Sequence, residues 1–294
     1  GATLRTIDVT GKAVIELFNA PSSTIRVKNG GTLASRSTDL GSEVIYLRAG
    51  SDNVHITIEK GAVVEGAAGE VIRSTNAATG AVLDNSGTIR RSSAGGDRLI
   101  HLFEARVLNR AGGLMQNDDA DDAEVEMENG GTLTNFGTNQ NLGYGLAFEG
   151  DLTDTVTETL INAGVISTAG TTAIDFRRGD DVLELRPGSI ITGRVLGRDG
   201  TDLLRFAGTG EARFGLGDIG STRQYRGFEL FELKSGAWTF TGSTPEAFSV
   251  TGGTLLGTGT FGGITATGGA IAPGAAGKVG TLSVLGDLTL GANA

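Results

Sequence analysis

The chain has 294 residues, enough for one large or two ordinary domains, and a net charge of −10 at pH 7. Because an acidic chain repels nucleic acid and anionic membranes, we expect neither as a partner. No apolar run reaches transmembrane length, so no membrane insertion of this segment is expected. There is no cysteine, and glycine is 49 of the residues, about twice the usual share. With aromatic residues at only 5%, this composition favours a thin aliphatic core in a narrow fold.

The chain begins with stretches in which apolar and polar side chains alternate. In residues 24–28, Ile25 and Val27 share one face, which indicates a half-buried strand. Residues 54–59 alternate in the same way and place His55 on the outward face. We therefore expect His55 to be a solvated surface residue and not a ligand.

A short unit made of a turn, a strand and a second turn recurs along the first two thirds of the chain. The clearest copy runs from Asn129 to Asn135. Most copies are separated by about 25 residues, with one short gap and two long ones, and such a period is typical of a repeat architecture. Aligned on the middle glycine or its equivalent, the copies lie at Gly31, Gly61, Gly87, Gly113, Gly131, Gly164 and Gly188 or Ser189.

Helical periodicity is nearly absent, and short strands are separated by Gly, Asn, Asp and Ser throughout. The spacing of like units is too long for hairpins, so we expect the strands of successive coils to stack in parallel about 4.8 Å apart. The asparagines that flank several units are expected to stack as amide ladders along the axis. The sequence therefore predicts an all-β fold, a parallel β-helix or solenoid.

His101 lies in an apolar stretch, where we expect a hydrogen-bonded histidine at the edge of the core. The acidic run of residues 118–128 begins as a solvated loop by composition, and its second half alternates so that Val125 and Met127 can point inward. A run of charges is usually a solvated face, and the ligand spacing of a known calcium loop is missing. We therefore predict no metal site.

Turns rich in glycine and aspartate precede strands at residues 178–185 and 197–204. They resemble a degraded form of a calcium-binding nonapeptide repeat, but there is no tandem array, and we interpret the aspartates as turn-closing residues. Arg178, Gly179 and Asp180 also spell the tripeptide that integrins recognise. A guanidinium and a carboxylate splayed from a glycine turn can bridge a charged pocket and a bound metal. These three residues are the predicted cell-attachment site.

The aromatic residues concentrate near the C-terminus. Trp238 and Phe240 alternate with a threonine, so both rings can share one face. We expect core packing and not a sugar-binding platform, with residues 206–294 forming a β-rich module that caps the coils of residues 1–205. The nine aromatic residues of this region are Phe206, Phe214, Tyr225, Phe228, Phe231, Trp238, Phe240, Phe248 and Phe261.

A family resemblance emerges in the same region. Residues 251–261 contain a Gly-Gly-Thr-Leu motif and are followed by glycine-rich segments at residues 268–274 and 280–290. This looks like the passenger-associated repeat at the C-terminal end of type V autotransporter passengers. Residues 231–242, which contain Trp238, are similar to the segment that often leads into that repeat.

The resemblance rests on repeat motifs in residues 180–294. In the earlier residues it rests only on general composition and on the pattern of short strands and turns. It implies a right-handed parallel β-helix, carried to the cell surface of a Gram-negative bacterium by its own C-terminal β-barrel translocator. It also implies that the C-terminal segment is an autochaperone, which folds first outside the membrane and templates the coils behind it. We take the chain to be a fragment of such a longer protein.

Two kinds of enzyme are considered, and neither is favoured. A serine protease needs a nucleophile, a histidine base and an orienting acid, but only His55 and His101 are present and no nucleophile elbow occurs. In a polysaccharide hydrolase or lyase, Asp180 and Asp181 would correspond to the paired aspartates of the pectin enzymes. The Gly-His-Gly and Arg-Ile-Lys motifs that accompany those aspartates are missing. We therefore expect no catalytic residue and no cofactor.

Adhesion is the favoured hypothesis. A surface-displayed passenger, anchored at the outer membrane through its barrel, would bind a host cell-surface or extracellular-matrix protein, or a glycan. The candidate contacts are residues 116–124 and the turn of residues 178–180. The alternatives are a purely structural stem with the binding domain upstream and, less favoured, a polysaccharide-degrading β-helix enzyme.

Overall fold

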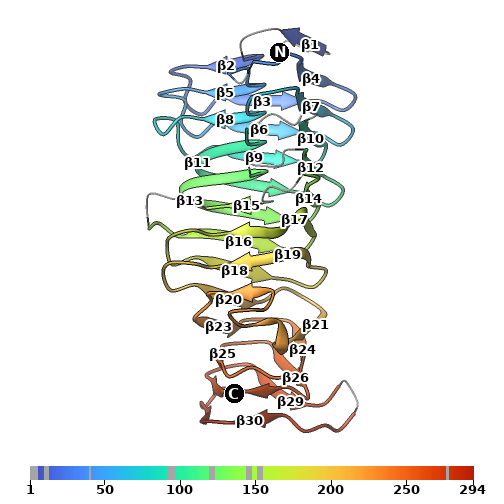
Figure 1. The fold of residues 1–294 in the computed structure, drawn as a ribbon, viewed down its shortest axis with the longest axis vertical. Coiled ribbons are helices and arrows are strands. Elements are labelled where there is room, and N and C mark those ends of the chain that lie inside the picture. Colours follow the sequence, from blue (N-terminus) through green and yellow to red (C-terminus); the bar gives the residue numbers. More distant parts are fainter. Residues whose placement is uncertain are drawn as a thin grey trace.

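The described residues form a column of stacked strands. Nearly all strand pairs are parallel, and the chain coils into a β-solenoid of about nine turns, which confirms the predicted fold. Figure 1 shows the strands stacked along one long axis with the two termini near opposite ends. The computed structural model describes residues 6–9, 13–39, 41–91, 97–118, 123–143, 148–150, 155–275 and 278–294.

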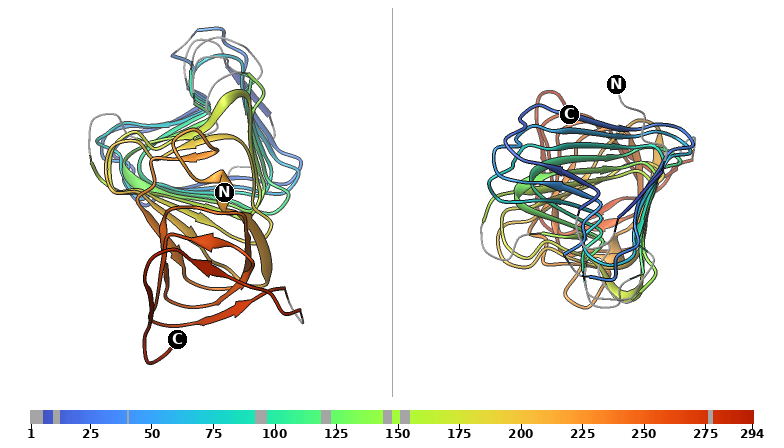
Figure 2. Two further views of the ribbon diagram at one scale, coloured as in Figure 1. Left: turned by 60° about the horizontal axis from the view of Figure 1, so that its bottom comes forward. Right: turned by 90° about the horizontal axis from the view of Figure 1, so that it is seen from above.

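Three columns of parallel strands, here called ladders, run along this axis, and Figure 2 shows how they superimpose when the molecule is seen from one end. Ladder 1 joins β3 (Thr24–Val27), β6 (His55–Ile58), β9 (Val82–Asn85), the second parts of β11 (Ile100–Asn109) and β13 (Val125–Asn135), β16 (Glu158–Asn162), β18 (Val182–Leu185), β20 (Leu203–Phe206), β23 (Leu230–Leu233), β25 (Ala247–Val250), β28 (Gly263–Ala266) and β31 (Leu288–Leu290).

The other two ladders cover the remaining sides of the coil. Ladder 2 joins β1 (Thr6–Val9), β4 (Thr32–Ser35), β7 (Val63–Gly66), β10 (Thr88–Arg91), β12 (Leu114–Asn117), β14 (Thr138–Asn141) and the first parts of β17 (Val165–Asp175) and β19 (Ile190–Leu196). Ladder 3 joins β2 (Ile15–Leu17), β5 (Ile45–Leu47), β8 (Ile72–Ser74), the first parts of β11 and β13, β15 (Phe148–Glu149), the ends of β17 and β19, and β22 (Tyr225–Arg226).

Ladder 2 is interrupted after β19, while ladder 1 continues. A separate sheet begins with β21 (Glu211–Gly215) and continues through β24 (Ala237–Thr241), β26 (Thr254–Gly257) and β29 (Ala270–Pro273). A further pair is formed by β27 (Thr260–Phe261) and β30 (Ser283–Val284), and the 3₁₀ turn η1 (Leu216–Asp218) follows β21. Because β20 pairs with β23 in ladder 1, strand pairing crosses residue 206 without a break. The division at residues 205 and 206 therefore stays a prediction based on core composition.

The repeat unit is confirmed, but its alignment is wrong at two places. The strand register places Ala62, not Gly61, and Gly137, not Gly131, beside the other aligned turn residues. Gly131 instead pairs with Ala105 in ladder 1, on a different side of the coil. The error arose because the same Asn, Gly and Thr residues serve turns at two corners of one coil. A Cβ at position 137 would lie 2.3 Å from the carbonyl oxygen of Gly113, so this position requires glycine.

The predicted asparagine ladder is confirmed at the corner between ladders 1 and 2. Asn85, Asn109, Asn135 and Asn162 are fully buried, and the side-chain amide of each of the first three donates to the next side-chain carbonyl at 2.9 Å. The amide of Asn162 ends the series on the Ser189 hydroxyl at 2.7 Å. The ladder thus satisfies polar groups at a buried corner and ties four successive turns together.

The aromatic core near the C-terminus is also confirmed. All nine aromatic side chains between residues 206 and 261 are buried. Trp238 and Phe240 share one face, with ring centroids 6.4 Å apart, and Phe206 contacts both of them. The core thus changes along the axis, from aliphatic residues in the first coils to packed rings in the last. In the part of the chain that the structure describes, no helix is long and apolar enough to cross a membrane.

Candidate functional site

The turn of residues 178–180 connects β17 to β18 and lies at the surface. Arg178 and Asp180 are exposed, whereas Gly179 is buried and has a φ of +126°. A Cβ at Gly179 would lie 2.9 Å from the carbonyl oxygen of Val156, so glycine is required at this position. The turn therefore presents one cationic and one anionic side chain from a constrained backbone.

The next turn of the solenoid stacks directly on this one. Arg178 and Asp199 form an isolated parallel bridge, and Oδ1 of Asp180 accepts a hydrogen bond from the backbone N–H of Thr201 at 2.7 Å. The two turns line a cavity of about 360 Å³, together with Thr155 and Gly200. One oxygen of Asp180 holds the stacked turn, and the Arg178 and Asp180 side chains are both exposed beside this cavity.

A column of carboxylates lies behind these turns. Each accepts a hydrogen bond from a backbone N–H one turn earlier, at the equivalent residue or, for Glu158, at the residue before it. Oε1 of Glu158 accepts from Gly130 at 3.1 Å, and Oδ1 of Asp181 accepts from Glu158 at 2.7 Å. Oδ1 of Asp202 accepts from Asp181 at 2.9 Å, and Oε2 of Glu229 accepts from Asp202 at 2.9 Å. We call these four residues, Glu158, Asp181, Asp202 and Glu229, the acid column.

The acid column shows that Asp181 and Asp202 close turns between coils, as the sequence indicated. Asp181 is buried and bonded to the backbone, whereas the adjacent Asp180 is exposed. The two carboxylates therefore face different surroundings and do not point together into one cleft.

Stability in this region is expected to fall as the pH rises. Burial, together with the neighbouring Asp181 and Glu229 carboxylates, raises the pKa of Asp202 from 3.8 to about 7. The folded state therefore binds a proton more tightly than the unfolded state, so this contribution decreases between about pH 4 and pH 7. The Asp202→Asn variant should match the parent chain near pH 4 and exceed its free energy of unfolding by up to a few kcal/mol at pH 8.

Urea unfolding across this pH range measures the difference between the two chains. Asp199→Asn, at the exposed turn, is the matched control and should show no such trend. A difference for Asp202→Asn that stays constant from pH 4 to pH 8 would contradict the assignment.

The prediction of a solvated acidic face over residues 118–128 is wrong for part of the run. Val125 and Met127 point inward as predicted, but Glu124 and Glu126 are buried as well. Burial raises the pKa of Glu124 well above its ordinary value. Alternation showed which side chains enter the core, but not which outward side chains are covered.

The predicted contact surface at residues 116–124 therefore does not include Glu124, which is fully buried. Residues 119–122 lie outside the described residues.

His101 is a hydrogen-bonded histidine at the edge of the core, as predicted, and His55 is exposed, as predicted. Nδ1 of His101 lies 2.8 Å from Oε1 of Glu70, and Nε2 lies 2.7 Å from Oε1 of Glu128. Sequence reasoning missed these carboxylate partners, which are 31 residues before and 27 residues after the histidine. The repeat spacing was the signal that could have found them, since both separations are close to one turn.

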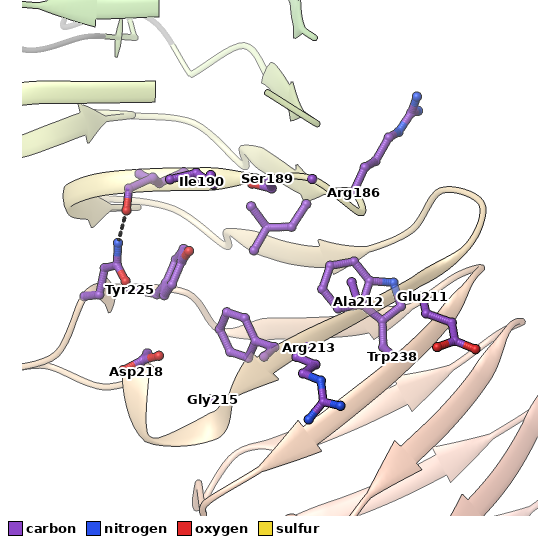
Figure 3. A pocket seen from close by; sticks show the side chains of 15 residues that line it. Arg186, Ser189, Ile190, Glu211, Ala212, Arg213, Gly215, Asp218, Tyr225 and Trp238 are labelled. Atoms are coloured by element: carbon purple, nitrogen blue, oxygen red, sulfur yellow. Dashed lines mark hydrogen bonds between the residues drawn. The ribbon is translucent and has the colours of Figure 1, made fainter. Parts of the chain in front are cut away.

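A cavity of about 610 Å³ lies where ladder 2 is interrupted, between β19 and β21. Figure 3 shows Tyr225 and Trp238 between the strand of Ile190 and the segment of Arg213, with the charged end of Arg213 turned away from the rings. The side-chain amide of Gln224 donates to the backbone carbonyls of Ile191 and Gly193 at 2.8 and 3.1 Å. It thereby satisfies acceptors that the interrupted ladder leaves on β19. The cavity is a concave surface with a buried aromatic floor and a charged rim.

The fold and the exposed turns define a class of protein: a parallel β-solenoid that displays short loops along a continuous column. Comparison with known proteins gives no narrower assignment, since no family model, no curated protein and no solved structure matches the chain.

Proposed function

We propose that the chain is part of the passenger of an autotransporter and acts as a surface-displayed adhesin. The observation that carries the proposal is the exposed pair of Arg178 and Asp180, held by stacked turns on the side of a solenoid of about nine turns. A column of this kind presents its turns in fixed positions and far from its base. Loops on such a scaffold are common sites of recognition.

The partner follows from the same chemistry. A splayed guanidinium and carboxylate suit a host cell-surface or extracellular-matrix protein that offers an acidic pocket beside a bound metal ion. The passenger would lie outside the cell, held at the outer membrane by its own C-terminal β-barrel. A glycan partner would instead use the cavity between β19 and β21, where polar side chains surround aromatic rings.

The C-terminal coils have a second proposed role in secretion. Stacking of coils depends on nearest neighbours and needs a nucleus, so a well-packed end can template the turns that follow. The ring cluster around Phe240 supplies the densest aromatic packing among the described residues. This supports the proposal that residues 206–294 fold first and guide the rest.

The attachment turn is tested by binding of the purified chain to extracellular-matrix proteins and integrins by surface plasmon resonance. We expect saturable binding that Asp180→Glu weakens at least about tenfold, because a longer side chain moves the carboxylate away from a bound metal. Asp199→Glu, on the stacked turn, is the matched control and should leave the affinity unchanged.

The other outcomes separate the competing hypotheses. Equal binding by the Asp180→Glu variant would place adhesion on another surface. No binding by the parent chain would leave the solenoid as a structural stem, and release of sugars from a polysaccharide by the parent chain would indicate an enzyme.

A further inference from the structure

We propose that His101, Glu126 and Glu128 form a binding site for a divalent transition-metal ion of the zinc type. The site goes beyond the proposed adhesive function and lies on ladder 3, where Glu149 and then Asp175 follow Glu126 in the next two turns. It contradicts our prediction from sequence that the chain has no metal site. Strand register creates it, since β11 and β13 place His101 directly beside Glu126.

The ligand atoms have the spacing that a small cation requires. One ligand atom from each residue can be chosen so that all three lie within 4.8 Å of one another. Nε2 of His101 lies 2.7 Å from Oε1 of Glu128 and 3.9 Å from Oε2 of Glu126. Ligands around tetrahedral zinc are about 3.3 Å apart, so these distances bracket the required value. Small side-chain rotations would complete the set.

The imidazole is already oriented as a metal ligand. Nδ1 contacts Oε1 of Glu70 at 2.8 Å, and this carboxylate is itself held by Nε of Arg73 at 3.0 Å. Histidines that bind metals usually donate the other ring N–H to a carboxylate in this way. Glu70 is 2% exposed, so the arrangement is built into the protein and is not a chance contact at the surface. It directs Nε2 toward Glu126 and Glu128.

The charge of the cluster favours a cation. Four carboxylates, those of Glu43, Glu70, Glu126 and Glu128, contact or flank two guanidinium groups, those of Arg73 and Arg98. The carboxylates thus outnumber the guanidinium groups by two at a largely buried position, which favours binding of a divalent ion. Arg98 already contacts Glu126, but a carboxylate can accept from a guanidinium and bind a metal at the same time.

The donor set selects the class of metal. One imidazole nitrogen with two carboxylate oxygens suits zinc, cobalt or manganese, whereas calcium and magnesium prefer oxygen ligands alone. Three protein ligands leave at least one coordination position for water. Such an ion would join two consecutive turns and, through Glu70, orient a third.

Isothermal titration calorimetry of the metal-free chain with ZnCl₂ tests the site, and the visible spectrum of the Co²⁺ form reports its geometry. We expect one ion per chain, a rise in the midpoint of thermal unfolding, and little response to Ca²⁺. Glu128→Gln should weaken zinc binding at least about 100-fold, and Glu70→Gln by about 10- to 100-fold. Because the chain has no cysteine and only two histidines, His55→Gln is the matched control and should bind as the parent chain does.

Three results would overturn the proposal: no saturable zinc binding, zinc binding that His55→Gln removes, or zinc binding that Glu128→Gln and His101→Gln both retain. Glu128 is half-buried, so its variant is expected to fold even if His101→Gln does not. Circular dichroism of each metal-free variant confirms folding before the titration.

Discussion

Replacing Phe240 by alanine is expected to lower the free energy of unfolding by about 3–5 kcal/mol, the usual cost of deleting a buried phenylalanine ring. Phe240 is fully buried at the centre of the C-terminal ring cluster, and the surrounding β-structure cannot easily collapse into the space left. Urea unfolding followed by circular dichroism measures the loss. The rings in contact belong to Phe206, Phe214, Trp238, Phe248 and Phe261.

The same variant tests the proposed order of folding. If the C-terminal coils template the others, the lost contacts already exist in the folding nucleus, and Phe240→Ala should slow refolding about tenfold or more. Phe148→Ala is the matched control, because Phe148 is a fully buried ring in an earlier coil. It should destabilise the chain by a similar amount through faster unfolding. Equal slowing of refolding in both variants would exclude a C-terminal template.

The second large effect is expected at Asn135, in the middle of the asparagine ladder. Asn135→Leu removes the bonds that its amide donates to Oδ1 of Asn162 and the carbonyl of Val165, and the bond that it accepts from Asn109. Buried polar groups then lose partners on both sides, which should cost about 3 kcal/mol or more in the free energy of unfolding. Thermal and urea unfolding measure this cost.

Asn85→Leu provides the comparison, because Asn85 is the first member of the ladder and pairs with Ile58 on its other side. Leucine there extends an existing aliphatic column and breaks the ladder only at its end. The bonds of Asn85 with the Leu114 carbonyl and the Gly87 N–H are lost as well, so we expect a smaller but still measurable loss. Equal losses at the two positions would show that the amides act separately and not as one connected series.

Much of the fold is predictable because the coil repeats its chemistry. Alternation in residues 24–28 and 54–59 gave the inward side chains, and asparagines at a near-constant spacing gave the ladder. The strand register was harder to predict, because Gly131 and Gly137 lie in similar sequence motifs on different sides of the coil. Only the stacking of whole turns decides between them.

The candidate sites were less predictable. The exposed Arg178 turn could be proposed because its tripeptide is contiguous in the sequence. The carboxylate partners of His101 were not proposed, because they lie on the turns before and after it, and only the repeat spacing relates them to the histidine. The cavity between β19 and β21 was missed for another reason. It forms where the two strands do not pair, and no residue pattern in the sequence predicts this missing pairing.

The interruption of ladder 2 also has a mechanical consequence. Tension along the column is shared among ladders wherever three are present, but between β19 and β21 it passes only through ladders 1 and 3. One of the three lateral connections is missing at this level, so we expect it to be more compliant than the preceding coils, in which all three ladders pair. Under the proposed adhesive function, flow would pull on this column, and we expect it to bend and extend at this level while the ring cluster beyond it keeps its packing.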